Sequence, residues 1–191
     1  MGGNLSLLWC FRHLHLFASN CTIEIRTKHF GDVHVYMYGN NHCLAVDECV
    51  TFKKGVICFE DNDCQISIGT GTTIEEATLS AVEDRCSIQI GKDCLISSKI
   101  YMSTSDAHTI LDNDNGTRIN RPGSIDISDH VWIGYNVTIN RGVTILSESV
   151  IAGNSVVTKD VPQNVIVAGV PAKIIKTNIN WDRKRQPVVL Y

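Results

Sequence analysis

The chain has 191 residues, 43% of them hydrophobic and 19% charged, so it is long enough for one domain with a continuous apolar core. Its formal net charge of −3 gives no reason to expect nucleic acid or an anionic membrane surface as a partner. Apolar residues recur throughout without a long polar tract, which excludes a largely disordered protein.

The most apolar stretch lies near the amino terminus, at residues 5–17 (LSLLWCFRHLHLF). It is too short to span a bilayer, and it contains one arginine and two histidines. No basic region precedes it and no small-residue cleavage site follows it, so we expect neither a membrane span nor a secretory signal. Residues 1–6 formally fit the loose myristoylation pattern, but we interpret them as a flexible start. We therefore expect a soluble, cytoplasmic protein.

The amino-terminal half repeats at a regular spacing, in which Val46, Ile68 and Ile90 hold the same place in successive copies. Four segments align in this way: 20–25, 42–46, 63–68 and 85–90. A three-sided coil of hexapeptides needs only 18 residues, so we expect each coil here to carry about four extra residues at one corner. Suitable polar turn residues occur at 39–41, 60–62 and 83–84.

Four of the eight cysteines follow the same period: Cys21, Cys43, Cys64 and Cys86. The chain has no CxxC pair, which disfavours a zinc ribbon or a redox motif. We predict that these cysteines occupy the same place in successive coils and pack as small, reduced hydrophobic side chains.

Residues 102–124 abandon the repeat and are rich in Ser, Thr, Asp, Asn and Gly. A long polar loop within a regular solenoid is uncommon unless it has a function. We predict an extruded loop here. Its histidine, His108, is a candidate for catalysis, with a solvated loop histidine as the alternative.

The carboxyl-terminal half has a strict six-residue period. An aliphatic residue recurs at Ile127, Ile133, Ile139, Ile145, Ile151 and Val157. Helical periodicity would place apolar residues three and four apart, so the pattern favours short strands separated by corners. Three such sides close one coil, and coils stack about 4.8 Å apart around a shared core. We predict an all-β parallel β-helix over residues 1–171 and a tail over 172–191, with a short helix around 178–186.

Trp132 holds the sixth place of its hexapeptide. If Ile127 and Val131 point inward, Trp132 points outward. A large outward aromatic side chain on a regular prism indicates a ligand groove or a subunit interface. Trp132 is therefore a candidate catalytic residue, with packing between subunits alone as the alternative.

Residues 127–176 resemble the hexapeptide-repeat acyltransferases. The resemblance rests on Val131-Trp132-Ile133-Gly134 and on residues 156–162 (VVTKDVP) and 169–173 (GVPAK), together with the loop histidine. Galactoside, maltose and capsular polysialic-acid O-acetyltransferases are the members it is most similar to. It is tight over 90–185 and confined to the repeat over 20–89. It implies a left-handed coil, a homotrimer, and acetyl-CoA bound in the groove between neighbouring prisms.

The resemblance also implies the chemistry. The family's catalytic histidine stands where His108 does, and the family's tryptophan follows that histidine at the same spacing that separates His108 from Trp132. An alcohol is a poor nucleophile at neutral pH, and histidine suits the role of general base. Asp106 and Asp112 are candidates for orienting it, and we expect the indole N–H of Trp132 to meet the acceptor or the thioester. We expect an O-acetyltransferase that acts on a sugar hydroxyl, as in capsule, lipopolysaccharide or exopolysaccharide synthesis.

For the donor, the resemblance assigns coenzyme A contacts to Tyr135, Gly153, Thr158, Lys159, Lys173 and Lys176. Lysines suit the phosphates of coenzyme A as point charges, although each lysine alone is more simply a solvated surface charge.

One departure concerns the acceptor. Galactoside acetyltransferases carry an acceptor-binding asparagine in the coil before the histidine loop, and residues 74–79 contain none. Glu75, Glu76 and Glu83 are the candidates for lining a different sugar site, with solvated glutamates as the alternative.

Two rival functions remain. The γ-type carbonic anhydrases share the left-handed coil and hold zinc between subunits, and His29 and His34 have a spacing compatible with metal ligands. They lie in an early coil without an evident third histidine. The other rival is a non-catalytic scaffold, against which His108 and the lysine-bearing carboxyl-terminal motif argue. The favoured function requires no metal.

Overall fold

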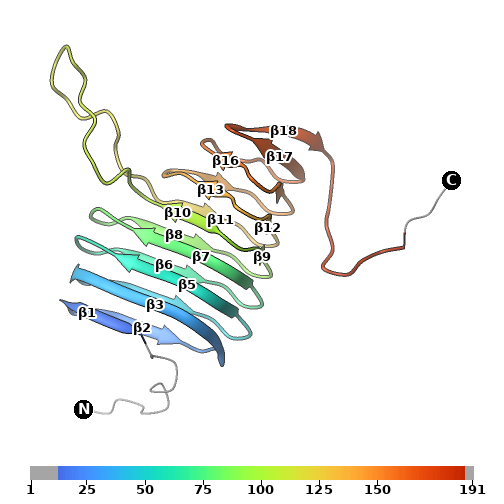
Figure 1. Cartoon of the computed structure of the whole chain (residues 1–191), viewed down its shortest axis with the longest axis horizontal. Helices are drawn as coiled ribbons and strands as arrows, with labels where there is room; N and C mark the ends of the chain where they lie inside the picture. The colour runs from blue at the N-terminus through green and yellow to red at the C-terminus, as the bar shows by residue number, and fades with distance from the viewer. Residues whose placement is uncertain (1–12, 188–191) are drawn as a thin grey trace.

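A computed structural model describes residues 13–187, and in that range the secondary structure consists of strands, turns and bends. They form a parallel β-solenoid of about 7 turns, which confirms the left-handed parallel β-helix (Figure 1). No helix in the described part of the chain is long and apolar enough to cross a membrane. The pattern at residues 1–6 and the first part of the apolar stretch 5–17 lie outside the described residues.

The strands follow one another as β1 (Leu14–Ser19), β2 (Thr22–Ile25), β3 (His29–Asn40), β4 (Cys43–Val46), β5 (Thr51–Phe59), β6 (Gln65–Ile68), β7 (Thr73–Ala81), β8 (Ser87–Ile90), β9 (Leu95–Ile96), β10 (Ile100–Ser103), β11 (Ile125–Ile127), β12 (Trp132–Ile133), β13 (Thr138–Ile139), β14 (Thr144–Ile145), β15 (Val150–Ile151), β16 (Val156–Val157), β17 (Val165–Gly169) and β18 (Ala172–Thr177).

The coils present three faces. One face is the sheet β2-β4-β6-β8-β11-β14. The second contains β9, β12, β15 and β17, and the third contains β10, β13 and β16. The long strands β3, β5 and β7 bend across the corner between these last two faces, because β7 pairs with both β9 and β10. At the carboxyl-terminal end, β18 pairs antiparallel with β17 and closes the stack.

The core is a column of stacked aliphatic side chains, as the six-residue period predicted. Ile133, Ile139 and Ile145 are fully buried, and each lies on a different face of the same coil. Val131 is buried while Trp132 is 41% exposed, so the predicted outward direction of the tryptophan is confirmed. Burial of successive aliphatic rungs supplies the favourable free energy that a single coil lacks.

The early coils are wider at one corner, as predicted. Eleven residues separate Ile57 from Ile68, whereas six separate Ile139 from Ile145, which hold the same two register positions in a later coil. The corner turns through residues with positive φ, and its amides stack in a ladder in which Asn40 donates to Asn62 at 3.1 Å and Asn62 donates to Asp84 at 3.1 Å. Short polar side chains suit these left-handed positions because they can hydrogen-bond locally.

The cysteine column differs from the prediction at one coil. Cys43 aligns with Gln65, and it is the buried His42 that aligns with Cys64. The first two residues of this column are therefore one position closer in the sequence than each later pair of neighbours. The spacing of the cysteines alone did not reveal that Cys43 is one position out of the column. Cys64 and Cys86 do pack inside, and burial raises the pKa of the Cys64 thiol to about 11, which keeps it protonated.

Two further boundaries differ. β10 continues to Ser103, so the extruded loop comprises residues 104–124. The predicted helix around 178–186 is wrong, because the chain there forms an extended strap. Asn178 has φ 56°, and Asp182 Oδ1 accepts a hydrogen bond from the Lys184 amide at 2.8 Å, a local bond that competes with helix formation. Contacts with distant coils hold the strap, as described below.

Candidate active site

A polar network holds the base of the extruded loop. The Arg118 guanidinium donates two hydrogen bonds of 2.6 Å to the Glu83 carboxylate, which also accepts one from the Ser105 hydroxyl. The bond from Arg118 lowers the pKa of Glu83 below its ordinary value. Two-point pairing of this kind fixes direction as well as distance. Glu83 was predicted to line the site of the sugar acceptor. In the structure it anchors the loop to the coil below it.

His108 lies near the beginning of this loop. Its amide donates to the Asp106 carbonyl at 2.8 Å, and its own carbonyl accepts from the Asn120 side chain at 2.7 Å. Ala107, just before it, takes a positive φ of 63°. The backbone is thus held on both sides, while the exposed imidazole has no hydrogen-bond partner among residues 13–187.

The two predicted orienting carboxylates have other partners. Asp106 accepts from Asn120 at 3.0 Å and pairs with Arg141 at 2.9 Å. Asp112 caps the tip of the loop, where it accepts from two backbone amides. Within the described part of one chain, neither is hydrogen-bonded to the His108 ring.

A pocket of about 410 Å³ opens beside the loop base, on the third face. It is lined by serine hydroxyls, by the outward ring of Tyr101, by Asp106 and Arg141, and by Ala107, the residue before His108. Hydroxyls, one aromatic face and one ion pair form a suitable lining for a polyhydroxylated ligand.

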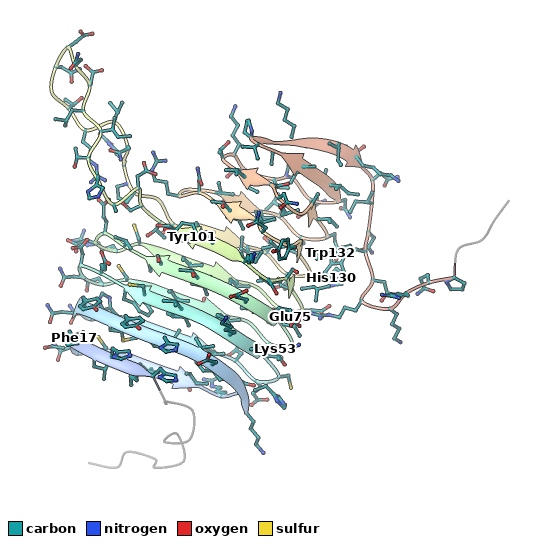
Figure 2. All side chains as sticks on the ribbon, viewed as in Figure 1. Phe17, Lys53, Glu75, Tyr101, His130 and Trp132 are labelled. Carbon is teal, nitrogen blue, oxygen red and sulfur yellow. The ribbon has the colours of Figure 1, made fainter. Side chains whose placement is uncertain are left out.

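Glu75 and Glu76 lie on β7, outside this pocket. Glu75 pairs with Lys53 at 2.7 Å and Glu76 with Lys54 at 3.4 Å, each across to the coil below. Figure 2 shows the Glu75–Lys53 pair apart from the loop. Both glutamates form ion pairs on the sheet surface.

Trp132 lies on β12, on the second face, and in Figure 2 it appears with His130 on the side of the molecule away from the loop. The strap passes beside it. Trp181 stacks on His130 with ring centroids 4.0 Å apart and lies 6.1 Å from Trp132. Its indole N–H donates to the His130 carbonyl at 2.9 Å.

Ionic contacts complete the attachment of the strap. Asp93 binds the His130 ring at 2.7 Å and Arg183 at 2.7 Å. Burial opposes protonation of His130, but its hydrogen bonds to the Trp181 carbonyl and to Asp93 outweigh that effect and raise its pKa. No signal in the sequence points to these residues, because the contacts join residues that are far apart along the chain.

The predicted donor contacts lie near this side. Tyr135 occupies the corner after β12, and the Lys99 ammonium lies 5.3 Å from its ring centre. Gly153 is in the next coil, where an added Cβ would come within 3.1 Å of the Tyr135 carbonyl oxygen. Thr158 and Lys159 form the exposed turn after β16, and Lys173 and Lys176 project from β18.

His29 and His34, the candidate ligands of the carbonic anhydrase alternative, do not belong to one ligand group among residues 13–187. His34 lies beside His13 and Asp32, whereas His29 begins β3 and joins no group of three candidate ligands in the described chain.

No family model matches the sequence. The polysialic acid O-acetyltransferase of Escherichia coli O1:K1 / APEC is 42% identical over 119 residues, which cover 62% of this chain and 38% of that protein. The protein of the same name from Neisseria meningitidis is 35% identical over 159 residues, which cover 83% of this chain and 73% of that one. The chain thus aligns with well under half of the first relative and with most of the second.

Solved structures give the same picture. The polysialic acid O-acetyltransferase OatWY superposes with a TM-score of 0.80 at 29% identity, over 93% of this chain and 96% of that one. A hexapeptide-repeat-containing acetyltransferase from Vibrio cholerae O1 biovar eltor, complexed with acetyl coenzyme A, has a TM-score of 0.51 at 35% identity, over 65% of this chain and 66% of that one.

Proposed function

The chain belongs to the hexapeptide-repeat acetyltransferases, the family of the polysialic acid O-acetyltransferases, and on this basis we propose that it transfers an acetyl group from acetyl-CoA to a hydroxyl of a saccharide. The names of the relatives support the reaction class, and the acetyl coenzyme A complex of one structural neighbour supports the donor. The acceptor in this proposal is a sugar of a capsular, lipopolysaccharide or exopolysaccharide type.

The observation that carries the proposal is the extruded loop. The coil pattern stops at Ser103, a polar network fixes the loop base, and the loop carries an exposed imidazole without a hydrogen-bond partner among residues 13–187, directly after Ala107, which lines a serine-containing pocket. In the reaction, His108 accepts the proton of the acceptor hydroxyl as its oxygen attacks the thioester carbonyl. The thiolate of coenzyme A leaves and is protonated, and no covalent enzyme intermediate is needed.

Trp132 and the lysine-bearing coils form the donor side of this proposal. Tyr135 and Gly153 offer backbone groups at a corner, while Lys159, Lys173 and Lys176 are free to approach the phosphates of coenzyme A because they are exposed. Trp181 lies beside Trp132, with ring centroids 6.1 Å apart.

The proposal includes a homotrimer. The loop and Trp132 lie on different faces of one prism, which supports a site formed when a second copy brings its Trp132 face to the first copy's loop. Exposed apolar side chains on the late coils support such packing: Trp132, Tyr135, Leu146, Ile174 and Ile175. Three copies around one axis give three equivalent sites.

The cytoplasm is the compartment we assign to this reaction. Seven cysteines lie in the described chain and none forms a disulfide there, which suits a reducing compartment.

The test is an assay of free thiol release from acetyl-CoA, with a panel of neutral and acidic saccharides as acceptors. The proposal expects thiol release that depends on one class of saccharide, and acetate ester on the product. The His29→Ala variant serves as the matched control for His108→Ala, because both imidazoles are exposed and only one lies in the loop. Absence of coenzyme A binding would favour the scaffold, and carbon dioxide hydration would favour the anhydrase.

A further inference from the structure

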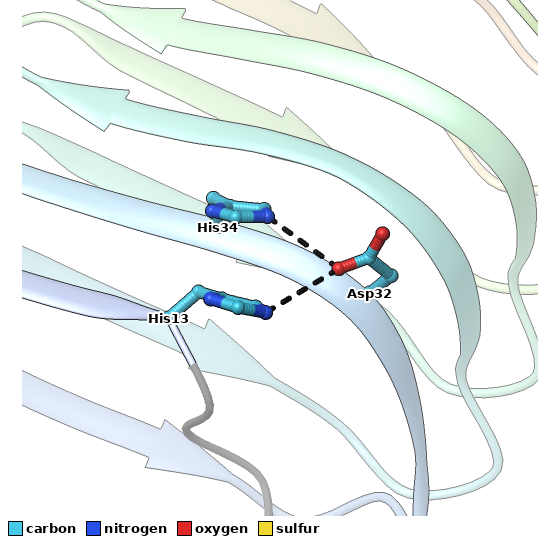
Figure 3. A group of neighbouring side chains, drawn as sticks. All are labelled: His13, Asp32 and His34. Carbon is cyan, nitrogen blue, oxygen red and sulfur yellow. Dashed lines mark ion pairs between the residues drawn. The ribbon is translucent and has the colours of Figure 1, made fainter.

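Three potential metal ligands meet on the first two coils, far along the chain from the loop. β1 and β3 are parallel, and the pairing of Leu14 with Val35 places His13 beside His34. Asp32 lies two residues before His34 on the same strand, so its side chain projects from the same face. Figure 3 shows both imidazoles directed at the Asp32 carboxylate.

The distances suit an ion better than hydrogen bonds. Asp32 Oδ1 lies 3.6 Å from His13 Nε2 and 3.4 Å from His34 Nε2, which is too long for good hydrogen bonds. In a tetrahedral zinc site with bonds of about 2.0–2.2 Å, neighbouring ligand atoms are about 3.3–3.5 Å apart. The three ligand atoms all lie within 4.8 Å of one another, so small rotations of the stacked rings bring them to ligand spacing.

The surroundings leave the carboxylate available. Lys54 is the cross-strand neighbour of Asp32, but its ammonium lies 3.4 Å from Glu76 in the coil beyond. A hollow of about 220 Å³ adjoins Asp32 and His34, and Lys54, Glu76 and Lys99 line its other parts. It gives an ion a path of entry and leaves room for a water or a small anion as a fourth ligand.

We propose that His13, Asp32 and His34 bind a divalent first-row transition-metal ion, with Zn²⁺ as the best match to two imidazoles and one carboxylate. The ion joins β1, the edge strand of its sheet in the described chain, to β3 and so fastens the first coil. It takes no part in acetyl transfer, and the site uses neither His29 nor a subunit interface. The proposal is therefore independent of the proposed function.

The experiment measures Zn²⁺ binding by calorimetry on the full chain after removal of metals with a chelator. We expect one ion per chain, with affinity at least tenfold weaker in His34→Gln and in Asp32→Asn. His29→Gln and His15→Gln keep the parent affinity, since neither side chain belongs to the group. Saturating Zn²⁺ raises the melting temperature of the parent and of both controls, and leaves that of His34→Gln unchanged.

Two further measurements separate this site from the free thiols. Co²⁺ bound at the site has an absorption spectrum without a thiolate charge-transfer band, and affinity falls in acid, because metal ligands must be deprotonated. A thiolate band, unchanged affinity in both His34→Gln and Asp32→Asn, or no binding at all would overturn the proposal.

Discussion

Two segments of this chain leave the regular solenoid, and they are attached in different ways. The loop 104–124 is fixed at its base by carboxylate–guanidinium pairs, Glu83 with Arg118 and Asp106 with Arg141. The strap 178–187 also has such a pair, Asp93 with Arg183, but a stacked indole and a histidine, His130, add to it, and the hydrogen bonds of His130 raise its pKa above the ordinary value.

The difference indicates what each attachment can do. Guanidinium and carboxylate groups keep their charges between about pH 5 and 9, so the loop that holds His108 stays fixed over that range. The strap beside Trp132 has in addition one contact that depends on pH, because the pKa of His130 is raised by its hydrogen bonds to Asp93 and to the Trp181 carbonyl. One segment is therefore a permanent support for the candidate base, and the other is an adjustable support for the candidate donor side.

The largest expected effect is at the loop. His108→Ala removes the proposed base and leaves the pocket and the solenoid intact, so kcat should fall about 10²–10⁴-fold. In the parent, catalysis by a single general base should give a rate that rises with pH and then levels off. Steady-state kinetics across pH tests both, with light scattering to check assembly. Near-full activity in His108→Ala would remove His108 from the mechanism.

The loop anchor should give the next largest effect. Glu83→Gln loses the two-point charge pairing with Arg118, and hydrogen bonds to charged groups are worth about 1.5–3 kcal/mol. We expect kcat to fall about tenfold or more, with faster amide hydrogen exchange over 104–124. Glu75→Gln is the control, since its ion pair lies on the sheet surface away from the loop.

The pH dependence of this anchor follows from the lowered pKa of Glu83. A depressed carboxyl pKa contributes stability above the ordinary value, and that stability is lost as the pH falls through the folded-state pKa. Loop exchange should therefore stay slow at neutral pH and rise only in acid. Fast loop exchange at pH 7 in the parent would contradict the comparison.

The donor side should respond more moderately. Replacing Lys173 and Lys176 with Gln removes two exposed cations, so coenzyme A should bind several-fold more weakly and with a smaller dependence on salt. Calorimetry at two ionic strengths measures this. If dephospho-CoA and coenzyme A lose affinity equally, these lysines do not contact the 3′-phosphate.

The smallest effect should be at the strap. The raised pKa of His130 means that its contact contributes fully below the ordinary value of about 6.5 and is lost as the pH rises through the folded-state value. Amide exchange of residues 178–187, corrected for its intrinsic pH dependence, should accelerate a few-fold as the pH rises above the ordinary histidine pKa of about 6.5. Asp93→Asn should flatten that response, and protection that grows with pH would contradict it.

The sequence predicted the repeating part of the molecule well for a physical reason. Each coil buries the same positions, so the aliphatic residues that recur from Ile127 to Val157 identify the side chains that point into the core. The position of Trp132 between them then predicts that its side chain points outward. The polar residues at the common corner of the early coils likewise predicted that these coils are wider.

What the sequence concealed depends on contacts between distant residues. We expected a short helix in the tail, but stacking of Trp181 on His130, far back along the chain, holds the tail extended. The shift of Cys43 and the meeting of His13 with His34 both follow from a first coil that is one position shorter than the coils after it. The amino-acid composition does not reveal a shift of one residue in strand register, although such a shift moves a side chain to the opposite face of the sheet.

The central claim is that the loop of one copy and the Trp132 face of another form one site. Mixing His108→Ala with Trp132→Ala subunits, each impaired alone, tests it most directly, with native mass spectrometry to confirm mixed trimers. The account predicts that activity returns. When subunits mix at random, roughly a quarter of all sites combine an intact loop from one subunit with an intact tryptophan from another. Mixed trimers that stay as impaired as the separate variants would show that each site lies within a single chain.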